Sequence, residues 1–266
     1  MFLARLCPFF VAFALPCGAA VEIIAHRGAS HDAPENTLAA MKLAWKQGAD
    51  AIELDLHLSK DGEIIVMHDA DTKRTTGVVG KIPDLAGEKL AQLDVGAWMH
   101  PRFANERIPS LQSVLQTVGP GKRVFIEIKC GPEILPRLKE VLTRVNLPPE
   151  RMVIIGFGLE TMAAAKEMFP NLKIFFLHGV KKNEPIPPIE ELVAKARGAK
   201  LDGLNLNYQF PVSAAFVRTV KEAGLELYVW TVDDPAIARQ WIDAGVAGVT
   251  TNRPQWLRTQ LSNAGR

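Results

Sequence analysis

Two histidines and two acidic residues in the first third of the chain have types and spacing suited to hydrolysis. Glu53 and Asp55 are two positions apart in a run typical of a β-strand, so both side chains lie on the same face of that strand. His26 precedes this pair and His68 follows it. Acidic residues can hold a metal ion and histidines can move protons, and hydrolysis of a stable ester needs both. The sequence therefore predicts a hydrolytic site that includes residues 26–69.

A third acidic residue, Glu127, lies with Lys129 at the end of a later strand. Unpaired carboxylates are costly to bury, so these acids need a cation. Glu53, Asp55 and Glu127 carry more charge than Arg27 and Lys129 neutralise if those two also bind an anionic substrate. We therefore expect a divalent metal ion, and a set of oxygen ligands favours Mg2+ or Ca2+ over zinc. The alternative is a group of acids neutralised by Arg27 and Lys129 alone.

A further histidine, His57, lies two positions after Asp55. It lies on the same strand face as Glu53 and Asp55 and could be a further ligand, but the pattern does not require it, and we interpret it as a rim or surface histidine. We interpret the remaining histidines and several polar loop residues as incidental, namely His31, His100, His178, Lys73, Arg74 and Thr75.

Strand and helix signals alternate along the chain that must position these residues. Predicted strands cover residues 21–25, 51–59, 63–67, 123–129, 152–155, 172–177, 203–207, 226–232 and 248–251. Predicted helices cover residues 37–47, 110–118, 134–145, 159–168, 188–196, 213–223, 235–244 and 254–261. The strand at 63–67 can pair with its predecessor as a hairpin across Asp61 and Gly62. Residues 70–109 are expected to be irregular.

Counting that hairpin as an elaboration of the second unit leaves eight strand–helix units. Such alternation over about 250 residues is the pattern of a closed α/β barrel. The competing doubly wound sheet lacks support because no glycine-rich dinucleotide turn follows the first strand. No linker divides the chain. We therefore predict a single-domain (β/α)8 TIM barrel over residues 21–266, with a small β-hairpin and loop elaboration after the second strand.

A barrel of this kind builds its active site at the C-terminal ends of its strands. Four of the predicted strands end in polar residues, and a fifth ends in an aromatic one. These residues are His26, Arg27, Glu53, Asp55, Glu127, Lys129, Asn252 and, as the aromatic one, Trp230. Because structural needs alone rarely place polar groups on so many strand ends, we expect them to form one site.

The first 20 residues have the composition of a secretory signal peptide. Arg5 is followed by the apolar run 8–16 and then by the small residues 18–20. The apolar run is too short to span a bilayer, so we expect no stable membrane anchor. We predict that residues 1–20 are removed and that the protein is exported, either to the periplasm or as a secreted protein.

Charge and cysteine content argue against other classes of protein. The chain has 31 Lys and Arg residues against 29 Asp and Glu residues, and this near balance argues against a nucleic-acid partner or an acidic membrane surface. Cys7 and Cys17 fall in the predicted signal peptide, which leaves Cys130 without a partner for an internal disulfide. The expected partner is a small molecule, and the sequence does not indicate an oligomeric state.

The order of the motifs resembles the glycerophosphodiester phosphodiesterase family. The motifs are His-Arg-Gly at 26–28, Pro-Glu-Asn-Thr at 34–37, Glu-x-Asp at 53–55, Asp-Gly at 61–62, His-Asp at 68–69 and Glu-Ile-Lys at 127–129. Further likeness lies in Arg-Thr-Thr-Gly at 74–77, Ile-Pro-Ser-Leu at 108–111, Trp-Thr-Val-Asp-Asp-Pro at 230–235 and Thr-Thr-Asn-Arg-Pro at 250–254. Each motif is weak alone, but their common order over nearly the whole chain is highly specific.

The resemblance implies a (β/α)8 barrel that binds one divalent cation, often Ca2+ or Mg2+. It implies hydrolysis of glycerophosphodiesters, such as glycerophosphocholine or glycerophosphoethanolamine, to glycerol 3-phosphate and an alcohol. For the family, the nucleophile is thought to be the glycerol 2-hydroxyl of the substrate itself, which gives a cyclic phosphate that water then opens. Nothing in this sequence decides that point.

The resemblance also implies a role for each motif residue. Glu53, Asp55 and Glu127 would be the metal ligands, and His26 and His68 the general acid and base, in an order that the sequence leaves open. The substrate contacts would come from Arg27 on the phosphate oxygens, Lys129 as a second cation, Glu35 and Asn36 orienting Arg27 or meeting the substrate, and Trp230 on the glycerol carbons.

The chain departs from the family pattern at two positions. Asn252 stands where aspartate is often seen, and we expect it to alter substrate preference, while Ser59 stands where threonine is common. The segment between Asp69 and Ser110 is short, which favours small headgroup diesters over bulky lysophospholipids. Two alternatives remain: a lysophospholipase D or sphingomyelinase D-like phosphodiesterase on the same barrel, and an inert binding protein that keeps the fold.

Overall fold

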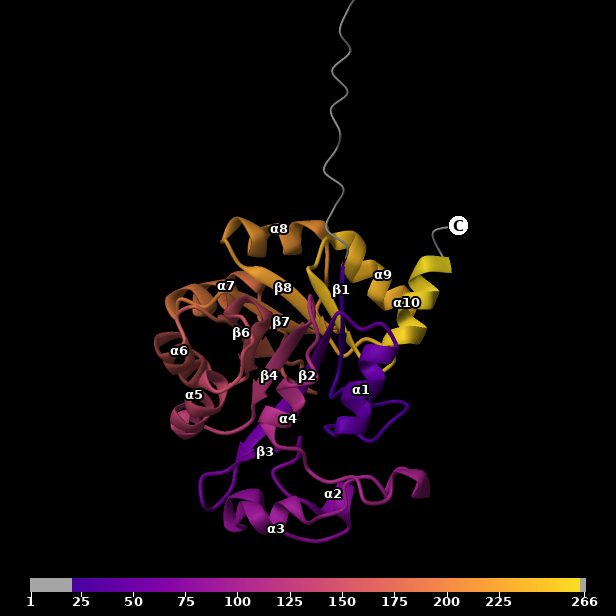
Figure 1. Ribbon diagram of the computed structural model, residues 1–266. Helices are drawn as coiled ribbons and strands as arrows, with labels where there is room; N and C mark the ends of the chain where they lie inside the picture. The colour runs from indigo at the N-terminus through magenta and orange to yellow at the C-terminus, as the bar shows by residue number, and fades with distance from the viewer. Residues whose placement is uncertain (1–20, 264–266) are drawn as a thin grey trace, which may run out of the picture.

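Eight parallel strands form a closed barrel in the computed structural model, which describes residues 21–263 (Figure 1). The barrel strands are β1 (Glu22–Ala25), β2 (Ala51–Leu58), β4 (Arg123–Ile128), β5 (Met152–Gly156), β6 (Lys173–His178), β7 (Gly203–Asn207), β8 (Glu226–Trp230) and β9 (Gly248–Thr251). They follow one another around the barrel, and β1 pairs with both β2 and β9, which closes it. The predicted (β/α)8 TIM barrel is confirmed. The predicted signal peptide lies outside the described residues.

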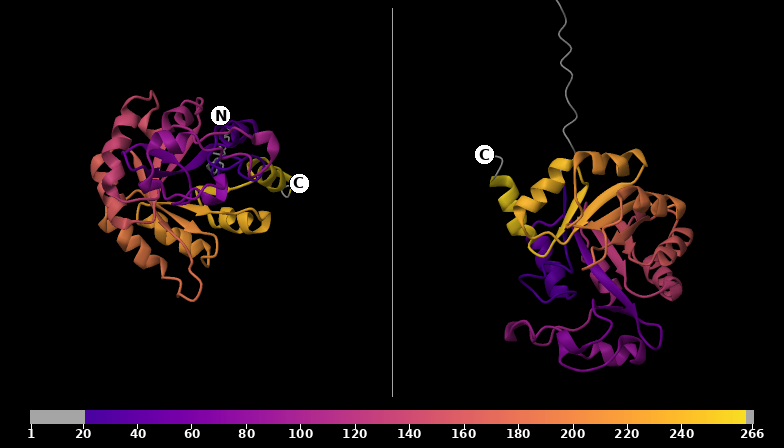
Figure 2. Two further views of the ribbon diagram at one scale, coloured as in Figure 1. Left: turned by 90° about the horizontal axis from the view of Figure 1, so that it is seen from below. Right: turned by 180° about the vertical axis from the view of Figure 1, so that it is seen from behind.

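A ring of helices surrounds the barrel (Figures 1 and 2). They are α1 (Leu38–Lys46), α4 (Leu111–Leu115), α5 (Leu135–Thr143), α6 (Leu159–Met168), α7 (Ile189–Gly198), α8 (Ala214–Glu222), α9 (Pro235–Ala244) and α10 (Pro254–Asn263). Single turns of 3-10 helix, η3 (Pro132–Ile134) and η4 (Pro149–Arg151), precede α5 and β5. Within residues 21–263, no helix is both long and apolar enough to cross a membrane.

The alternation of side chains along β2 separates two layers of the molecule. Ile52, Leu54 and Leu56 are buried in the core between barrel and helices. The barrel interior has a separate apolar cluster built around the rings of Phe125, Phe175 and Tyr228. A packed interior of this kind leaves the polar residues at the strand ends as the place for chemistry.

The chain between β2 and α4 forms a separate small unit. It contains β3 (Ile64–Val66), α2 (Lys73–Thr76), η1 (Ile82–Asp84), α3 (Gly87–Ala91) and η2 (Pro101–Phe103). The strand β3 pairs antiparallel with β2, as predicted for the hairpin. The segment from 68 to 110, called the inserted segment below, lies at one end of the barrel, apart from the ring of helices (Figure 1).

The expectation that residues 70–109 are irregular was partly wrong. The helices of the inserted segment are five residues or shorter, so they are too short to show a helical repeat in the sequence. They are held instead by a small core of their own, which consists of Ile65, Met67, Ile82, Leu90, Val95 and Ile108. Tertiary packing therefore stabilises helices that local pattern does not reveal.

The turn after β1 explains the glycine of the His-Arg-Gly motif. Gly28 has a φ of +81°, and a Cβ atom built on it would lie 2.6 Å from the backbone of Ala40 in α1. Only glycine suits both the left-handed backbone and this close approach. Arg27 is also left-handed, with a φ of 55°. This strained turn brings α1 against the barrel and directs the residues at 26 and 27 toward its open end.

Candidate active site

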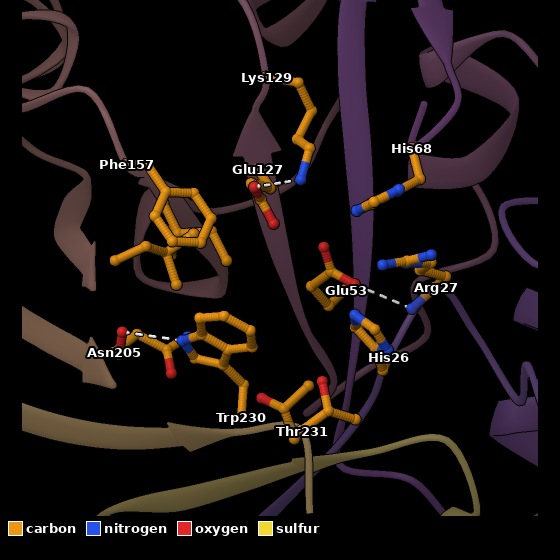
Figure 3. A pocket seen from close by; sticks show the side chains of 13 residues that line it. His26, Arg27, Glu53, His68, Glu127, Lys129, Phe157, Asn205, Trp230 and Thr231 are labelled. Carbon is orange, nitrogen blue, oxygen red and sulfur yellow. Dashed lines mark hydrogen bonds and ion pairs between the residues drawn. The ribbon is translucent and has the colours of Figure 1, made fainter. Parts of the chain in front are cut away.

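A cavity of about 180 Å3 lies at the C-terminal ends of the strands. Its lining includes seven residues that the sequence predicted for the site: His26, Arg27, Glu53, His68, Glu127, Lys129 and Trp230. Figure 3 shows the two histidines and Arg27 on one side, Phe157 and Trp230 on the other, and Glu53 between them. The cavity therefore has one charged half and one largely apolar half.

The three predicted metal ligands lie together at the base of the charged half. In the pairing of β2 with β4, Asp55 is the direct partner of Glu127, and Glu53 points to the same face. One oxygen of each of the three carboxylates lies within 4.8 Å of the others. All three residues are almost fully buried, with exposed fractions of 2%, 0% and 7% for Glu53, Asp55 and Glu127. The barrel thus concentrates negative charge where water is nearly excluded.

This concentration of charge perturbs the acids strongly. Burial, reinforced by the charge of Asp55, raises the pKa of Glu53 well above its usual value and that of Glu127 to about 7. Burial opposes ionisation of Asp55 too, but the nearby cations Arg27 and Lys129 outweigh it and lower the pKa of Asp55. The cluster is therefore short of positive charge even with two basic residues beside it.

Unpartnered oxygens show that the cluster suits a metal ion. Glu53 Oε1 and Asp55 Oδ1 are buried and accept no hydrogen bond from any residue between 21 and 263. Leaving buried carboxylate oxygens without a donor is costly, and a divalent cation would satisfy them. Carboxylate oxygens are the ligands that Mg2+ and Ca2+ prefer. The donor set and its unmet charge therefore fit the divalent cation that the family resemblance implied.

The two basic residues predicted to hold phosphate already contact the acids. Lys129 Nζ lies 2.7 Å from Glu127 Oε1 and 3.5 Å from Asp55 Oδ1. Arg27 Nε lies 3.4 Å from Asp55 Oδ2, and the Arg27 backbone N–H donates to Glu53 Oε2 at 2.8 Å. The acids therefore draw both cations to the cavity wall, where an anionic substrate would meet them.

Glu35 and Asn36 do not line this cavity. Glu35 Oε1 accepts a hydrogen bond from Arg27 Nη1 at 3.0 Å, and Asn36 Nδ2 donates to Asp55 Oδ2 at 2.8 Å. Both line a separate, smaller cavity next to His68. Of the two roles that the sequence left open for them, their positions favour orienting Arg27 and Asp55 over meeting the substrate.

His26 has a neutral partner whose orientation is fixed. Its Nδ1 lies 2.7 Å from Asn252 Oδ1, while Asn252 Nδ2 donates to Asp233 Oδ2 at 2.7 Å. Because a carboxylate can only accept, the amide must turn its nitrogen to Asp233 and its oxygen to His26. His26 therefore donates from Nδ1 and keeps the lone pair on Nε2. Burial, with the charge of Arg27, lowers the pKa of His26 to about 4, so the ring is neutral at physiological pH.

His68 has a charged partner instead. Its Nδ1 lies 2.7 Å from Asp69 Oδ1. A hydrogen bond from Arg74 Nε, at 2.6 Å, is the main reason why the pKa of Asp69 falls to about 2. Asp69 is therefore a carboxylate, which can only accept, so His68 donates to it from Nδ1.

His57 and Asn252 take places that differ from those expected. His57 is buried rather than at the rim or surface, because its Nε2 bonds to the backbone carbonyl of His68 at 3.1 Å. It is outside the cluster of potential metal ligands. Asn252, which we expected to alter substrate preference, does not line the cavity but contacts His26.

Arg74, Phe157 and Asn205 are among the site residues that the sequence did not indicate. Arg74, interpreted as incidental, bonds to both Asp69 and Glu35. Phe157 and Asn205 line the cavity beside Trp230. The ring centroids of Phe157 and Trp230 lie 5.6 Å apart. Inward alternation along β5 and β7 could have indicated Phe157 and Asn205, whereas the only hint of Arg74 was its place in the Arg-Thr-Thr-Gly motif.

Comparison with known proteins agrees with this geometry. The chain matches the glycerophosphoryl diester phosphodiesterase family over residues 26–256. A glycerophosphodiester phosphodiesterase of Caldanaerobacter subterraneus is 35% identical over 248 residues, which cover 91% of this chain and 98% of the relative. Another from Bacillus subtilis is 32% identical over 250 residues, which cover 87% of this chain and 83% of the relative.

Solved structures share the fold over almost the whole chain. A phosphodiesterase of Oleispira antarctica in complex with the product sn-glycerol-3-phosphate has a TM-score of 0.80 and 27% identity, and the match covers 91% of this chain and 96% of that one. The glycerophosphodiester phosphodiesterase of Thermotoga maritima has a TM-score of 0.73 and 29% identity, and the match covers 90% of this chain and 98% of that one. From its sequence match, its barrel and the acids and histidines gathered at the strand ends, this chain belongs to the glycerophosphoryl diester phosphodiesterase family and is a phosphoric diester hydrolase.

Proposed function

We propose that the enzyme hydrolyses small glycerophosphodiesters, such as glycerophosphocholine or glycerophosphoethanolamine, to glycerol 3-phosphate and an alcohol. The observation that carries the proposal is the presence, in one cavity, of a buried acid cluster and two histidines with opposite kinds of partner. The product named for the Oleispira antarctica relative, sn-glycerol-3-phosphate, supports the assignment of the glycerophosphate side.

We infer that Mg2+ or Ca2+ is the cofactor, held by Glu53, Asp55 and Glu127. When bound, the ion supplies positive charge next to the phosphate oxygens. It would also meet the charge of the acids that now engage Arg27 and Lys129. Those two side chains would then hold the phosphate, a task that suits the planar, permanently charged guanidinium of Arg27.

His26 acts as the general base in this proposal. Its neutral ring carries the lone pair on Nε2 and lines the cavity, so it can take the proton from the oxygen nucleophile that attacks phosphorus. If that nucleophile is the glycerol 2-hydroxyl, the step gives a cyclic phosphate, which water then opens to the glycerol phosphate product. The resulting imidazolium keeps its Nδ1–H bond to Asn252. The partner of His26 thus sets which nitrogen is free to accept a proton.

His68 acts as the general acid. As the new phosphorus–oxygen bond forms, the bond to the alcohol breaks, and the leaving oxygen takes a proton from His68 Nε2. The carboxylate of Asp69, 2.7 Å from Nδ1, accepts the Nδ1–H and orients the ring for this step. The opposite partners of the two histidines support this assignment of the roles that the sequence left open.

The apolar half of the cavity suits the carbon skeleton of glycerol. Trp230 and Phe157 meet edge to face there, and Trp230 Nε1 donates to the backbone carbonyl of Asn205 at 3.0 Å, which fixes the indole ring. A rigid aromatic wall opposite the phosphate-binding side chains would hold a small, partly apolar group. A cavity of about 180 Å3 favours a small diester over a lysophospholipid.

An assay for the released alcohol, choline or ethanolamine, with a coupled assay for glycerol 3-phosphate on the two deacylated diesters, tests the proposal. The substrates are glycerophosphocholine, glycerophosphoethanolamine and lysophosphatidylcholine, before and after chelation and with Mg2+ or Ca2+ added back. We expect turnover of the first two, its loss on chelation and its recovery with one of the ions. Faster turnover of lysophosphatidylcholine would favour the lysophospholipase D alternative, and metal binding without turnover of any diester would favour an inert binding protein.

We further propose that the enzyme is exported and acts in the periplasm or outside the cell, on the basis of the composition of residues 1–20. Expression of the full chain and of a chain that starts at Val21, followed by cell fractionation, tests this. We expect only the full chain to leave the cytoplasm, with residues 1–20 removed. Retention of the full chain in the cytoplasm would contradict export.

A further inference from the structure

We propose that Arg74 is a positioning residue that fixes His68, through Asp69, against the barrel. The inference rests on the proposed function, since it concerns the role of His68 in the same reaction. Arg74 belongs to α2 in the inserted segment and does not line the cavity, so it acts through its neighbours.

The Arg74 guanidinium binds two carboxylates at once. Its Nε and Nη2 donate to Asp69 Oδ2 and Oδ1 at 2.6 and 3.2 Å. Its Nη1 and Nη2 donate to Glu35 Oε2 and Oε1 at 2.9 and 2.7 Å. Each acid is thus held by two hydrogen bonds, which fixes its plane as well as its position. A lysine has a single point of charge and could not hold both acids in this way.

These contacts connect His68 to the barrel. Asp69 holds Nδ1 of His68 at 2.7 Å, and Glu35, from the loop before α1, holds Arg27 at 3.0 Å. His68 itself follows β3 and lies at the start of the inserted segment. Without Arg74, Asp69 would lose its connection to Glu35, and its plane could turn relative to the imidazole. The bridge therefore sets the direction in which His68 Nε2 points.

Stability is a poor explanation for this arrangement. The Arg74 side chain is 42% exposed, and exposed ion pairs contribute little to the free energy of folding. The local backbone is nevertheless built to present Arg74. Thr75 is buried, Thr76 Oγ1 donates to the carbonyl of Thr72 at 2.6 Å, and Gly77 ends α2 with a left-handed φ of 73°. The Arg-Thr-Thr-Gly motif is thus a short helix that holds one arginine in place.

The leaving group separates this role from a general structural one. Choline leaves as a strongly basic alkoxide unless His68 protonates it, whereas p-nitrophenolate leaves without a proton. A variant that misaligns His68 should therefore slow the cleavage of glycerophosphocholine but not of glycerophospho-p-nitrophenol. A variant that disturbs the fold or the phosphate site should slow both.

The experiment compares Arg74→Gln and Arg74→Lys with the control Arg107→Gln. Arg107 is an arginine of the same segment, and its side chain has a similar exposed fraction, 44% against 42% for Arg74. It pairs with Asp94 at 3.8 Å. We expect both Arg74 variants to lose about 10- to 100-fold in kcat for glycerophosphocholine and less than about threefold for glycerophospho-p-nitrophenol. The control should retain both activities.

Two further measurements test the path through Asp69. Arg74→Gln should cause no additional loss in an Asp69→Asn background. In 15N-histidine NMR spectra of the whole enzyme, Arg74→Gln should shift the ring signals of His68 and leave those of His26 unchanged. Equal loss with both leaving groups, additive loss with Asp69→Asn, or an unchanged His68 signal would overturn the inference.

The same measurements keep this inference separate from the proposed function. If the wild-type enzyme cleaves neither glycerol diester, the proposed function fails, and the NMR spectra still decide whether Arg74 positions His68. If Arg74→Gln does not fold, Arg74→Lys keeps the positive charge and decides the same question.

Discussion

The two histidines of the cavity lie in regions that are built differently. His26 follows the first barrel strand, and its partners Asn252 and Asp233 follow other barrel strands, so this side belongs to the rigid barrel. His68 lies at the start of the inserted segment, and its partner Asp69 is held by an exposed arginine. The barrel gives its histidine a neutral amide as partner, and the inserted segment gives its histidine a carboxylate. The two histidines therefore differ in the charge of their hydrogen-bond partner.

Removal of the base should have the largest effect. His26→Ala should lower kcat by about a thousandfold or more for both glycerophosphocholine and glycerophospho-p-nitrophenol, because both need the attacking hydroxyl deprotonated. Steady-state kinetics with circular dichroism as a folding control measures this. A folded His26→Ala enzyme with near wild-type activity would contradict the proposed mechanism.

Removal of the acid should have a large but selective effect. His68→Ala should lower kcat by about a hundredfold or more for glycerophosphocholine, and by less than about tenfold for glycerophospho-p-nitrophenol, whose leaving group needs no proton. The ratio of the two losses is the measured quantity. If His26→Ala shows the selective loss and His68→Ala the uniform one, the two roles are reversed.

Exchange of the partner of His26 should shift the pH dependence of the reaction. The pKa of His26 is lowered to about 4, mainly by burial and then by Arg27. Asn252→Asp places a negative charge next to Nδ1, which raises this pKa, so the base is protonated and inactive up to a higher pH. The acid limb of the kcat/KM profile should move upward by about one to two pH units.

Asp69→Asn is the matched control for that shift. It leaves Asn252, the partner of His26, unchanged. The acid limb should stay in place. An acid limb that moves in Asp69→Asn but not in Asn252→Asp would contradict the assignment of His26 as base.

The smallest expected effect concerns stability. Asn252→Ala should lower the free energy of unfolding by about 1–3 kcal/mol, because it removes the hydrogen-bond partner of two partly buried atoms, His26 Nδ1 and Asp233 Oδ2. Asp69→Ala should cost less than about 1 kcal/mol, because its contact with Arg74 is exposed. Urea unfolding of both variants measures the difference, and equal losses would show that the two regions are equally rigid.

Local pattern was enough to predict the barrel strands and the acid cluster. Each strand is a short apolar run between turn residues, and such runs can be recognised without reference to the rest of the chain. The alternation of β2 placed Glu53 and Asp55 on the face opposite Ile52 and Leu54, and the barrel has kept them so. The barrel topology then brought Glu127 beside Asp55.

The expectations for the inserted segment were poorer for a physical reason. Its helices are too short to show a repeat, and the contacts that stabilise them come from residues far apart in the chain. Arg74 looked like an ordinary loop residue because its partner Glu35 lies 39 positions away. His57 looked exposed because nothing in the sequence shows that its ring meets the backbone of His68.

The sequence by itself determined the inventory of chemical groups, the order of the strands and the end of the barrel at which the groups meet. Only the tertiary structure decided which partner each histidine has. His26 and Asn252 are 226 positions apart, whereas His68 and Asp69 are neighbours, and neither separation indicates a role. A histidine becomes a base or an acid through the charge and burial of its hydrogen-bond partner, and packing alone brings that partner into place.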